Sequence, residues 1–297
     1  MQLPWRTACL LALSLAMACS RPAPPPAGAF EPSADFAPLS PPQPGDWLEQ
    51  RPEKGQTFER FVASKPHRPD ARRDRLYLQP LGEFPPGSAP PFNKLREFME
   101  AFFAMEVVIR PPLDLSQENI TSRRHPYQGH RQRRAGDLLH FLGKRLPPDA
   151  YALLGFTMED LYPSPDWNFV FGMASMRNGV GVSSFVRYDP RFYGDERPPN
   201  WEIIMLRRSC KVLAHETAHM FAIAHCTSYR CLINGSNSLE ELDQRPFDLC
   251  PVDLRKLHHS IGFDVVDRYE RLLDFTESAG LAEEAAWYRR RIAHLTQ

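Results

Sequence analysis

Three histidines and a glutamate in the segment HETAHMFAIAHC, from His215 to Cys226, have the types and spacing of a zinc site. His215 and His219 are four residues apart, so on a helix their rings share one face and can reach one ion. His225 follows six residues after His219 and can supply a third nitrogen if the chain turns sharply after the helix. Three protein ligands and one open position are the usual arrangement of a catalytic zinc.

Glu216 lies between the first two histidines, where a zinc peptidase places its general base. A bare HExxH pattern also occurs by chance on surface helices that bind no metal. The third histidine and the apolar, helix-forming residues 210–214 just upstream argue against that interpretation. We therefore predict a hydrolytic zinc site with three histidine ligands and Glu216 as the base.

The first residues have the composition of an export signal. Residues 1–19 contain one charge, Arg6, and an apolar stretch from Ala8 to Leu15, and small residues precede Cys19. The sequence Ala-Met-Ala-Cys-Ser resembles a bacterial lipoprotein box, in which Cys19 would be lipidated; the alternative is an ordinary signal peptidase site and a secreted protein. We expect an exported, membrane-anchored lipoprotein that faces the periplasm or the cell exterior, or otherwise a secreted protein.

The rest of the chain divides by composition. Residues 20–50 are rich in proline and alanine and predict a tether between membrane and domain. Residues 51–297 have the length of one large domain or two small subdomains. No later apolar stretch is long enough to span a bilayer, so the predicted membrane contact is the lipid anchor alone.

Charge argues against a nucleic-acid partner. The chain has 36 basic and 36 acidic residues and a formal net charge of zero, whereas nucleic-acid binding usually leaves a strongly basic footprint. One basic segment, RRHPYQGHRQRR from Arg123 to Arg134, stands out. We interpret it as a solvated loop that leads into a helix, and favour this over a role in attracting acidic substrates.

Short proline and glycine clusters separate the predicted elements. Strands are expected at residues 75–79, 106–110, 150–157, 167–173 and 181–188, and helices at residues 92–105, 135–146, 203–221, 253–259, 265–279 and 282–295. Strands and helices alternate ahead of the zinc helix, which indicates a mixed α/β part with a twisted sheet. The chain after His225 is irregular at first and then helical.

With these features the sequence resembles the archaemetzincins, a branch of the metzincin zinc peptidases. The family pattern is HExxHxxGxxHC, then a second cysteine, a methionine turn and a late CxxC pair. The residues that match it are His215, Glu216, His219, His225, Cys226, Cys231 and Cys250. Residues 76–84, 160–175 and 233–241 are also similar to the family, and the likeness spans about residues 75–297.

The resemblance implies an α+β fold of the metzincin type. A twisted mixed sheet and the active-site helix would form an upper subdomain, and a mainly helical and irregular lower subdomain would lie across the cleft. Beside the catalytic zinc, it implies a second, structural zinc held by four cysteines. Its substrates would be peptides or proteins that pair with an edge strand of the cleft. We expect residues 167–173 near that edge, or else as simple aromatic core packing.

Three residues depart from the family pattern. Ala222 stands where the family has glycine, and at positive φ alanine costs about 1 kcal/mol, which metal binding would offset or which would shift His225. Ile233 stands where the turn methionine belongs and keeps an apolar base beneath the zinc. Asp253 replaces the second cysteine of the late pair.

Asp253 leaves two interpretations open. A carboxylate oxygen can complete a tetrahedral site, so Cys226, Cys231, Cys250 and Asp253 would still hold a second zinc. Alternatively, that site is lost and two of the remaining cysteines form a disulfide in an exported protein. We favour the retained metal.

These observations predict a zinc-dependent metallopeptidase that hydrolyses peptide bonds with metal-activated water and Glu216 as general base. The first alternative is a non-catalytic zinc-binding surface lipoprotein that holds a peptide or protein partner, which the three departures suggest. The second is a surface structural or adhesive protein whose zinc serves folding only. Such a site needs a fourth ligand, for which the sequence offers His258 or His259.

Overall fold

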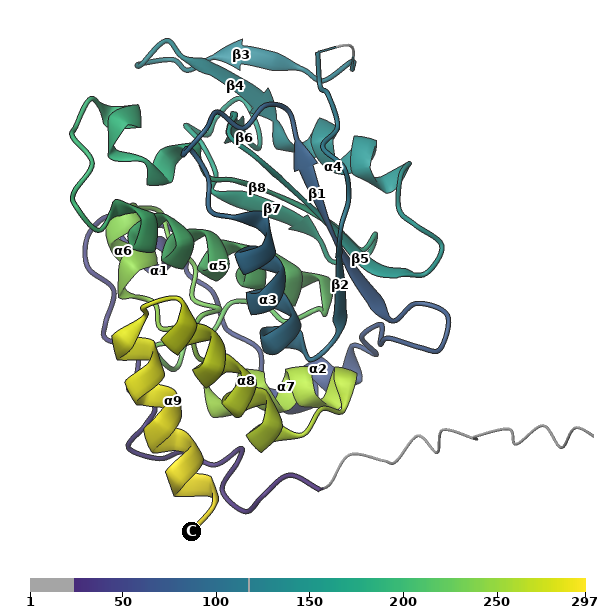
Figure 1. Ribbon diagram of the computed structural model, residues 1–297, viewed down its shortest axis with the longest axis vertical. Helices are drawn as coiled ribbons and strands as arrows, with labels where there is room; N and C mark the ends of the chain where they lie inside the picture. Colours follow the sequence, from purple (N-terminus) through teal and green to yellow (C-terminus); the bar gives the residue numbers. More distant parts are fainter. Residues whose placement is uncertain (1–23, 117) are drawn as a thin grey trace, which may run out of the picture.

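The computed structural model of the chain describes residues 24–116 and 118–297. The export signal expected at residues 1–19, with Cys19, lies outside these residues. Within them a sheet crosses the upper part of the molecule and most helices lie below it (Figure 1). No helix in the described part of the chain is long and apolar enough to cross a membrane.

The main sheet is mixed, as the sequence predicts, and the fold class is α+β. Its strand order is β2-β1-β5-β8-β7. The strands are β1 (Arg75–Leu81), β2 (Glu106–Ile109), β5 (Ala150–Thr157), β7 (Gly172–Ser175) and β8 (Val180–Ser184). β2, β1, β5 and β8 run parallel to one another. β7 is antiparallel to β8 and forms one edge of the sheet.

Alternate residues of β5 pack into two different hydrophobic cores, because successive side chains of a strand point to opposite faces. Leu154 and Phe156 belong to the larger core, with α3 (Phe92–Phe103) and α5 (Trp201–Met220). Leu153 belongs to a smaller core with α4 (Ala135–Gly143) on the other face. The sheet is therefore covered on both faces, which fixes the position of α5.

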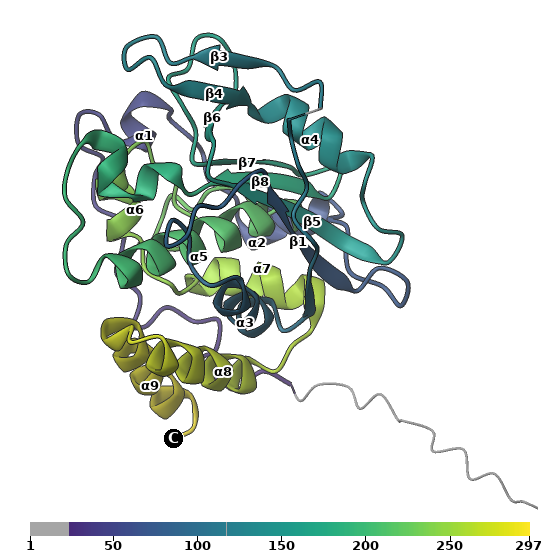
Figure 2. The same cartoon turned by 45° about the horizontal axis from the view of Figure 1, so that its top comes forward.

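The lower half is helical, as expected. It contains α6 (Leu239–Gln244), α7 (Pro251–Ile261), α8 (Val265–Ser278) and α9 (Ala282–Leu295). Figure 2 shows α8 and α9 side by side beneath α3. α7 begins after Cys250, whose sulfur accepts a hydrogen bond from the Asp253 amide, and ends at Gly262 in the left-handed conformation. A residue without a side chain adopts that conformation without strain.

The basic segment forms strands instead of the solvated loop that we expected. β3 (Ser122–Arg124) and β4 (Arg131–Arg134) pair as a hairpin, and β6 (Asp160–Tyr162) completes a small three-stranded sheet. The Arg123 guanidinium donates hydrogen bonds to the carbonyl oxygens of Pro165 and Asn168 at 2.9 and 3.2 Å. The hairpin thus holds the loop that precedes β7.

This contact explains why the strand predicted at residues 167–173 begins later in the structure, at Gly172. The carbonyl of Asn168 is bonded to the Arg123 and Gln132 side chains, and not to a neighbouring strand. Only Val170 makes an isolated bridge, to Leu161, and the strand itself begins at Gly172. The edge strand is therefore β7, just beyond most of the predicted range.

Residues 24–57, which we call the N-terminal strap, differ from the expected tether. They pack along the domain, include the short helix α1 (Trp47–Gln50), and precede α2 (Phe58–Ala63). The Arg291 guanidinium of α9 donates to the carbonyls of Gly28 and Ala29 at 2.8 and 3.1 Å, and Phe36 is buried. These contacts make the strap part of the folded unit from Gly28 onward.

Candidate active site and second metal cluster

α5 carries His215, Glu216 and His219 on its last turns, below the sheet, with His215 and Glu216 buried and His219 partly buried. The helix ends at Met220, and Ala222 then adopts a φ of +61°, as predicted for this position. The left-handed residue turns the chain sharply, as a glycine would do at no steric cost. This turn brings His225 back beside the helix.

The three histidines meet as predicted. Their ligand nitrogens all lie within 4.8 Å of one another, and the Nε2 atoms of His215 and His219 are 3.0 Å apart. Ala222 therefore does not displace His225 from the site.

Each of the three rings is anchored through its Nδ1 atom. Nδ1 of His215 lies 3.1 Å from the Leu232 carbonyl, and Nδ1 of His219 lies 2.7 Å from the Ile223 carbonyl. Nδ1 of His225 lies 2.9 Å from a carboxylate oxygen of Glu53, in the N-terminal strap. Hydrogen bonds at Nδ1 leave each Nε2 free to bind a metal, so the residues present fit a zinc ion.

The two helix histidines are neutral at physiological pH. Burial lowers the pKa of His215 well below its usual value, and the nearby Arg245 charge adds to this. Burial also lowers the pKa of His219 to about 4. A zinc ligand must be unprotonated, so neither ring has to lose a proton before it binds the ion.

Glu216 lies between α5 and the edge strand. A Cβ atom on Gly172 of β7 would be 2.5 Å from its Oε1, so only glycine leaves room for this carboxylate. Burial raises the pKa of Glu216 to about 8, and the positive charge of Arg245 opposes the shift. A carboxyl group of this kind exchanges its proton near neutral pH, as acid–base catalysis requires.

A cleft of about 690 Å³ opens at this point, and the histidines, Glu216 and β7 line it. Two aromatic side chains from distant segments form part of its wall: Trp47 of the strap and Trp167 of the loop before β7. Their ring centres are 6.3 Å apart. The Arg51 guanidinium stacks on Trp167 at 3.6 Å from the ring centre. The strap therefore builds part of the cleft, which the sequence did not reveal.

Arg245 is a second residue that sequence reasoning missed. It is buried in the cleft, and its guanidinium lies 3.3 Å from Nδ1 of His215 and donates a hydrogen bond to Ser236. Its Nε has no hydrogen-bond partner among the described residues. The site thus contains a permanent positive charge next to Glu216.

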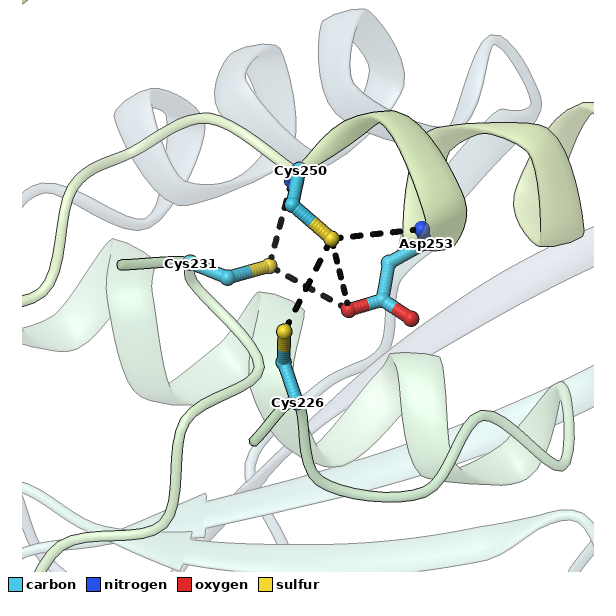
Figure 3. A group of neighbouring side chains, drawn as sticks. All are labelled: Cys226, Cys231, Cys250 and Asp253. Atoms are coloured by element: carbon cyan, nitrogen blue, oxygen red, sulfur yellow. Dashed lines mark hydrogen bonds between the residues drawn. The ribbon is translucent and has the colours of Figure 1, made fainter. Parts of the chain in front are cut away.

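Directly after His225 the chain enters a second cluster, of Cys226, Cys231, Cys250 and Asp253 (Figure 3). Their ligand atoms lie within 4.8 Å of one another, and all four residues are buried. The Asp253 carboxylate directs Oδ2 at two sulfurs, accepting hydrogen bonds from Cys231 at 3.3 Å and Cys250 at 3.4 Å. Three sulfurs and one oxygen converge as they would around a tetrahedral zinc.

The other oxygen of Asp253 has a different partner. Oδ1 lies 2.8 Å from Nζ of Lys256, one turn further along α7, and both side chains are 1% exposed. No disulfide joins the four cysteines of the described residues, which include the buried Cys210. Ile233 is buried, and its carbonyl accepts a hydrogen bond from the Cys226 amide at 3.1 Å.

Comparison with known proteins identifies the family. Peptidase family M54 matches residues 150–259. Archaemetzincin-2 of Macaca fascicularis is 37% identical over 285 residues, which cover 85% of this chain and 78% of that protein. Archaemetzincin-2 of Homo sapiens is 37% identical over 276 residues, 82% of this chain and 76% of that protein. The chain belongs to the archaemetzincin family.

Solved archaemetzincin structures share the fold. Archaemetzincin from Methanopyrus kandleri is 26% identical with a TM-score of 0.51, over 65% of this chain and 97% of that one. A zinc-dependent peptidase from Methanocorpusculum labreanum is 25% identical with a TM-score of 0.51, over 61% of this chain and 99% of that one. This archaemetzincin is a zinc metallopeptidase, and the predicted family, fold class and cofactor are confirmed.

Proposed function

We propose that this archaemetzincin hydrolyses peptide bonds with Glu216 as its general base. The observation that carries the proposal is the position of the Glu216 carboxylate, which lies in the cleft beside the histidines and against the edge strand. His215, His219 and His225 would hold the zinc ion, which would supply activation of the attacking water and polarisation of the scissile carbonyl.

The protein's own groups divide the remaining work. Glu216 accepts a proton from the attacking water and passes it to the leaving amine. The positive charge of Arg245 opposes the effect of burial on Glu216 and favours its ionised form, which is the form that accepts the proton. The hydrogen bonds at Nδ1 of the histidines hold the rings in one orientation throughout the reaction.

The substrate is proposed to bind as an extended peptide along β7. β8 pairs with one side of β7, and no other strand in the described part of the chain pairs with its second side. Residues 172–174 of β7 line the cleft. An open strand edge beside a catalytic centre can add a peptide as a further strand, with main-chain hydrogen bonds that tolerate many side chains.

Hydrolysis of a fluorogenic peptide library tests the catalytic role, with wild-type protein and Glu216→Gln. The variant should keep its zinc and lose activity by about 10²- to 10⁴-fold. Glu202→Gln, near the exposed start of α5, is the matched control and should retain full activity. Unchanged cleavage by Glu216→Gln would contradict the role of the base. Absence of cleavage by folded, zinc-loaded wild type would favour the non-catalytic peptide-binding alternative.

A second, structural zinc is proposed at Cys226, Cys231, Cys250 and Asp253. The convergence of three free thiols and a carboxylate oxygen in a buried site supports it. Zinc analysis of the purified protein should give two ions per chain, and one ion in His219→Ala. One ion in wild type together with no titratable thiols at these positions would favour the disulfide alternative.

Export with lipidation at Cys19 is proposed from the N-terminal sequence. Residues 20–27 would then separate the lipid from Gly28, the first strap residue that is bonded to α9. We expect the mature protein to fractionate with membranes and Cys19→Ala to release it. Mass spectrometry of the mature N-terminus distinguishes lipidation from ordinary signal cleavage.

A further inference from the structure

His225 differs from the other two zinc ligands in how its ring is held. His215 and His219 bond to main-chain carbonyls close to the site, at Leu232 and Ile223. His225 bonds to the side chain of Glu53, which is 172 residues away in the sequence. Its two carboxylate oxygens lie 2.9 and 3.0 Å from Nδ1 of His225.

Glu53 is itself held in place. The indole Nε1 of Trp47 donates to Oε1 of Glu53 at 2.7 Å, and the same indole packs edge-on against the His225 ring, with ring centres 5.2 Å apart. The main-chain amide of Trp47 donates to Glu241 of α6 at 2.8 Å. Trp47 thus fixes the carboxylate from one side and touches the ring that the carboxylate binds.

Gln56 of the strap holds the turn that carries His225. Its amide nitrogen donates to the Ala222 carbonyl at 3.1 Å, and its amide oxygen accepts from the Ala224 amide at 3.2 Å. The two bonds enclose Ile223, directly after the left-handed Ala222. Beside this turn Gly55 packs so closely that a Cβ there would lie 2.3 Å from Oγ1 of Thr227.

From these contacts we propose that the N-terminal strap completes the zinc site, with Glu53 and Gln56 as positioning residues for His225. Glu53 orients the ring so that Nε2 faces the ion, and its negative charge makes the imidazole a stronger ligand. Gln56 fixes the backbone from the Ala222 carbonyl to the Ala224 amide, where the strained alanine would otherwise leave the third ligand less well held. The strap is therefore a functional part of the peptidase.

This inference rests on the zinc site of the proposed function but not on catalysis. Zinc affinity is measured by competition with a chelator, in the full folded domain and without substrate. His219→Ala should lose zinc binding at the histidine site and keep it at the cysteine cluster. The binding event that this variant lacks is therefore assigned to the histidine site. A catalytically inactive protein would therefore still give a clear answer.

The variants are Glu53→Ala, Glu53→Gln and Gln56→Ala. Glu53→Ala should weaken zinc binding at the histidine site by about 10- to 100-fold, the usual cost of losing such a partner. Glu53→Gln should recover part of this loss because its amide oxygen still accepts the Nδ1 hydrogen bond. The control is Glu49→Gln, a strap carboxylate on α1 that contacts only the Gly45 amide, and its zinc affinity should equal that of the wild type.

The absorption spectrum of the Co²⁺-substituted protein provides a readout that a purely structural role would not move. We expect Glu53→Ala to change the ligand-field bands of the histidine site while the thermal unfolding temperature stays close to that of the wild type. If Glu53→Ala unfolds, the folded Glu53→Gln carries the test through its affinity and spectrum. Wild-type zinc affinity and spectrum in the Glu53 variants, or an equal loss in Glu49→Gln, would overturn the proposal.

Discussion

The two metal clusters of this protein are joined by one peptide bond, between His225 and Cys226, yet they are built differently. The histidine cluster has three ligands, lines a cleft, and its His219 and His225 are only partly buried. The cysteine cluster has four ligand groups, all of them buried (Figure 3). An open site with three ligands leaves a position for water and substrate, whereas a closed site with four ligands is typical of structural zinc.

The charges of the ligand groups also differ between the two clusters. Neutral imidazoles leave the full charge of an ion available to act on a substrate. Thiolates and the Asp253 carboxylate would neutralise the ion, and Lys256 adds a compensating charge beside them. Neighbouring residues of one chain are thus suited to two different kinds of metal site, because burial and ligand type differ between the two clusters.

The largest expected effect is the loss of stability on removing a ligand of the closed cluster. Cys231→Ala should lower the free energy of unfolding by several kcal/mol, on the order of 5, because binding energy of structural zinc is folding energy. His219→Ala should abolish activity with a much smaller loss of stability. Urea unfolding of both variants measures this difference. Equal losses of stability would show that the two clusters do not divide their roles.

The buried ion pair beside the closed cluster should give the next largest effect. Lys256→Met leaves the Asp253 carboxylate without its partner and should cost about 3 to 5 kcal/mol in zinc-free protein. With zinc bound the cost should be smaller, because the ion then compensates the carboxylate. Lys94→Met is the control, since Lys94 forms a pair of the same spacing with Glu97 that is only partly buried, worth under about 1 kcal/mol. An equal cost with and without zinc would contradict coordination by Asp253.

Proton release on zinc binding should also separate the clusters. Burial raises the pKa of Cys231, and the hydrogen bond to Cys226 raises that of Cys250, so both thiols are protonated at pH 7. Hydrogen bonds from these two thiols lower the pKa of Cys226 and so favour its thiolate form. The closed cluster should therefore release about two protons per zinc.

His215 and His219 of the histidine cluster should release almost none, because burial keeps these two rings neutral. Titration calorimetry in two buffers of different ionisation enthalpy counts the protons. His219→Ala isolates the closed cluster, and the difference from wild type gives the histidine cluster. Similar proton release from both would contradict the assigned ionisation states.

Local spacing explains why the histidine site could be predicted from the sequence. His215 and His219 are one helical turn apart, and the left-handed conformation of Ala222 follows from the family's glycine at that position. Every ligand is within eleven residues of the others, so helix geometry and one turn determine the arrangement. The same holds for α5 itself, which spans the predicted range to within two residues.

Contacts between distant segments could not be predicted in this way. Glu53 reaches His225 across 172 residues, and the proline-rich composition around it suggested a tether. The strand predicted at residues 167–173 failed because Arg123, more than 40 residues earlier, bonds the carbonyls of that loop. Whether Asp253 can act as a metal ligand depends on the thiols of Cys231 and Cys250 lying beside it. Cys231 and the pair Cys250 and Asp253 come from separate segments, so their proximity could not be predicted from either segment alone.

The smallest expected effect concerns Ala222, the left-handed residue between α5 and His225. Ala222→Gly should stabilise the protein by up to about 1 kcal/mol, because glycine adopts the left-handed conformation without strain. Ala104→Gly is a matched control, since Ala104 ends α3 at a φ of +50°, in a different element, and should give a similar gain.

Zinc affinity should remain unchanged in both variants, because Glu53 and Gln56 already hold His225 and its turn in place. Chelator competition and thermal unfolding measure the two quantities on the same samples. A several-fold rise in zinc affinity for Ala222→Gly alone would mean that the strained alanine displaces the third ligand. The strap contacts would then only partly prevent this displacement of His225. The rise in zinc affinity would measure the part of the displacement that they do not prevent.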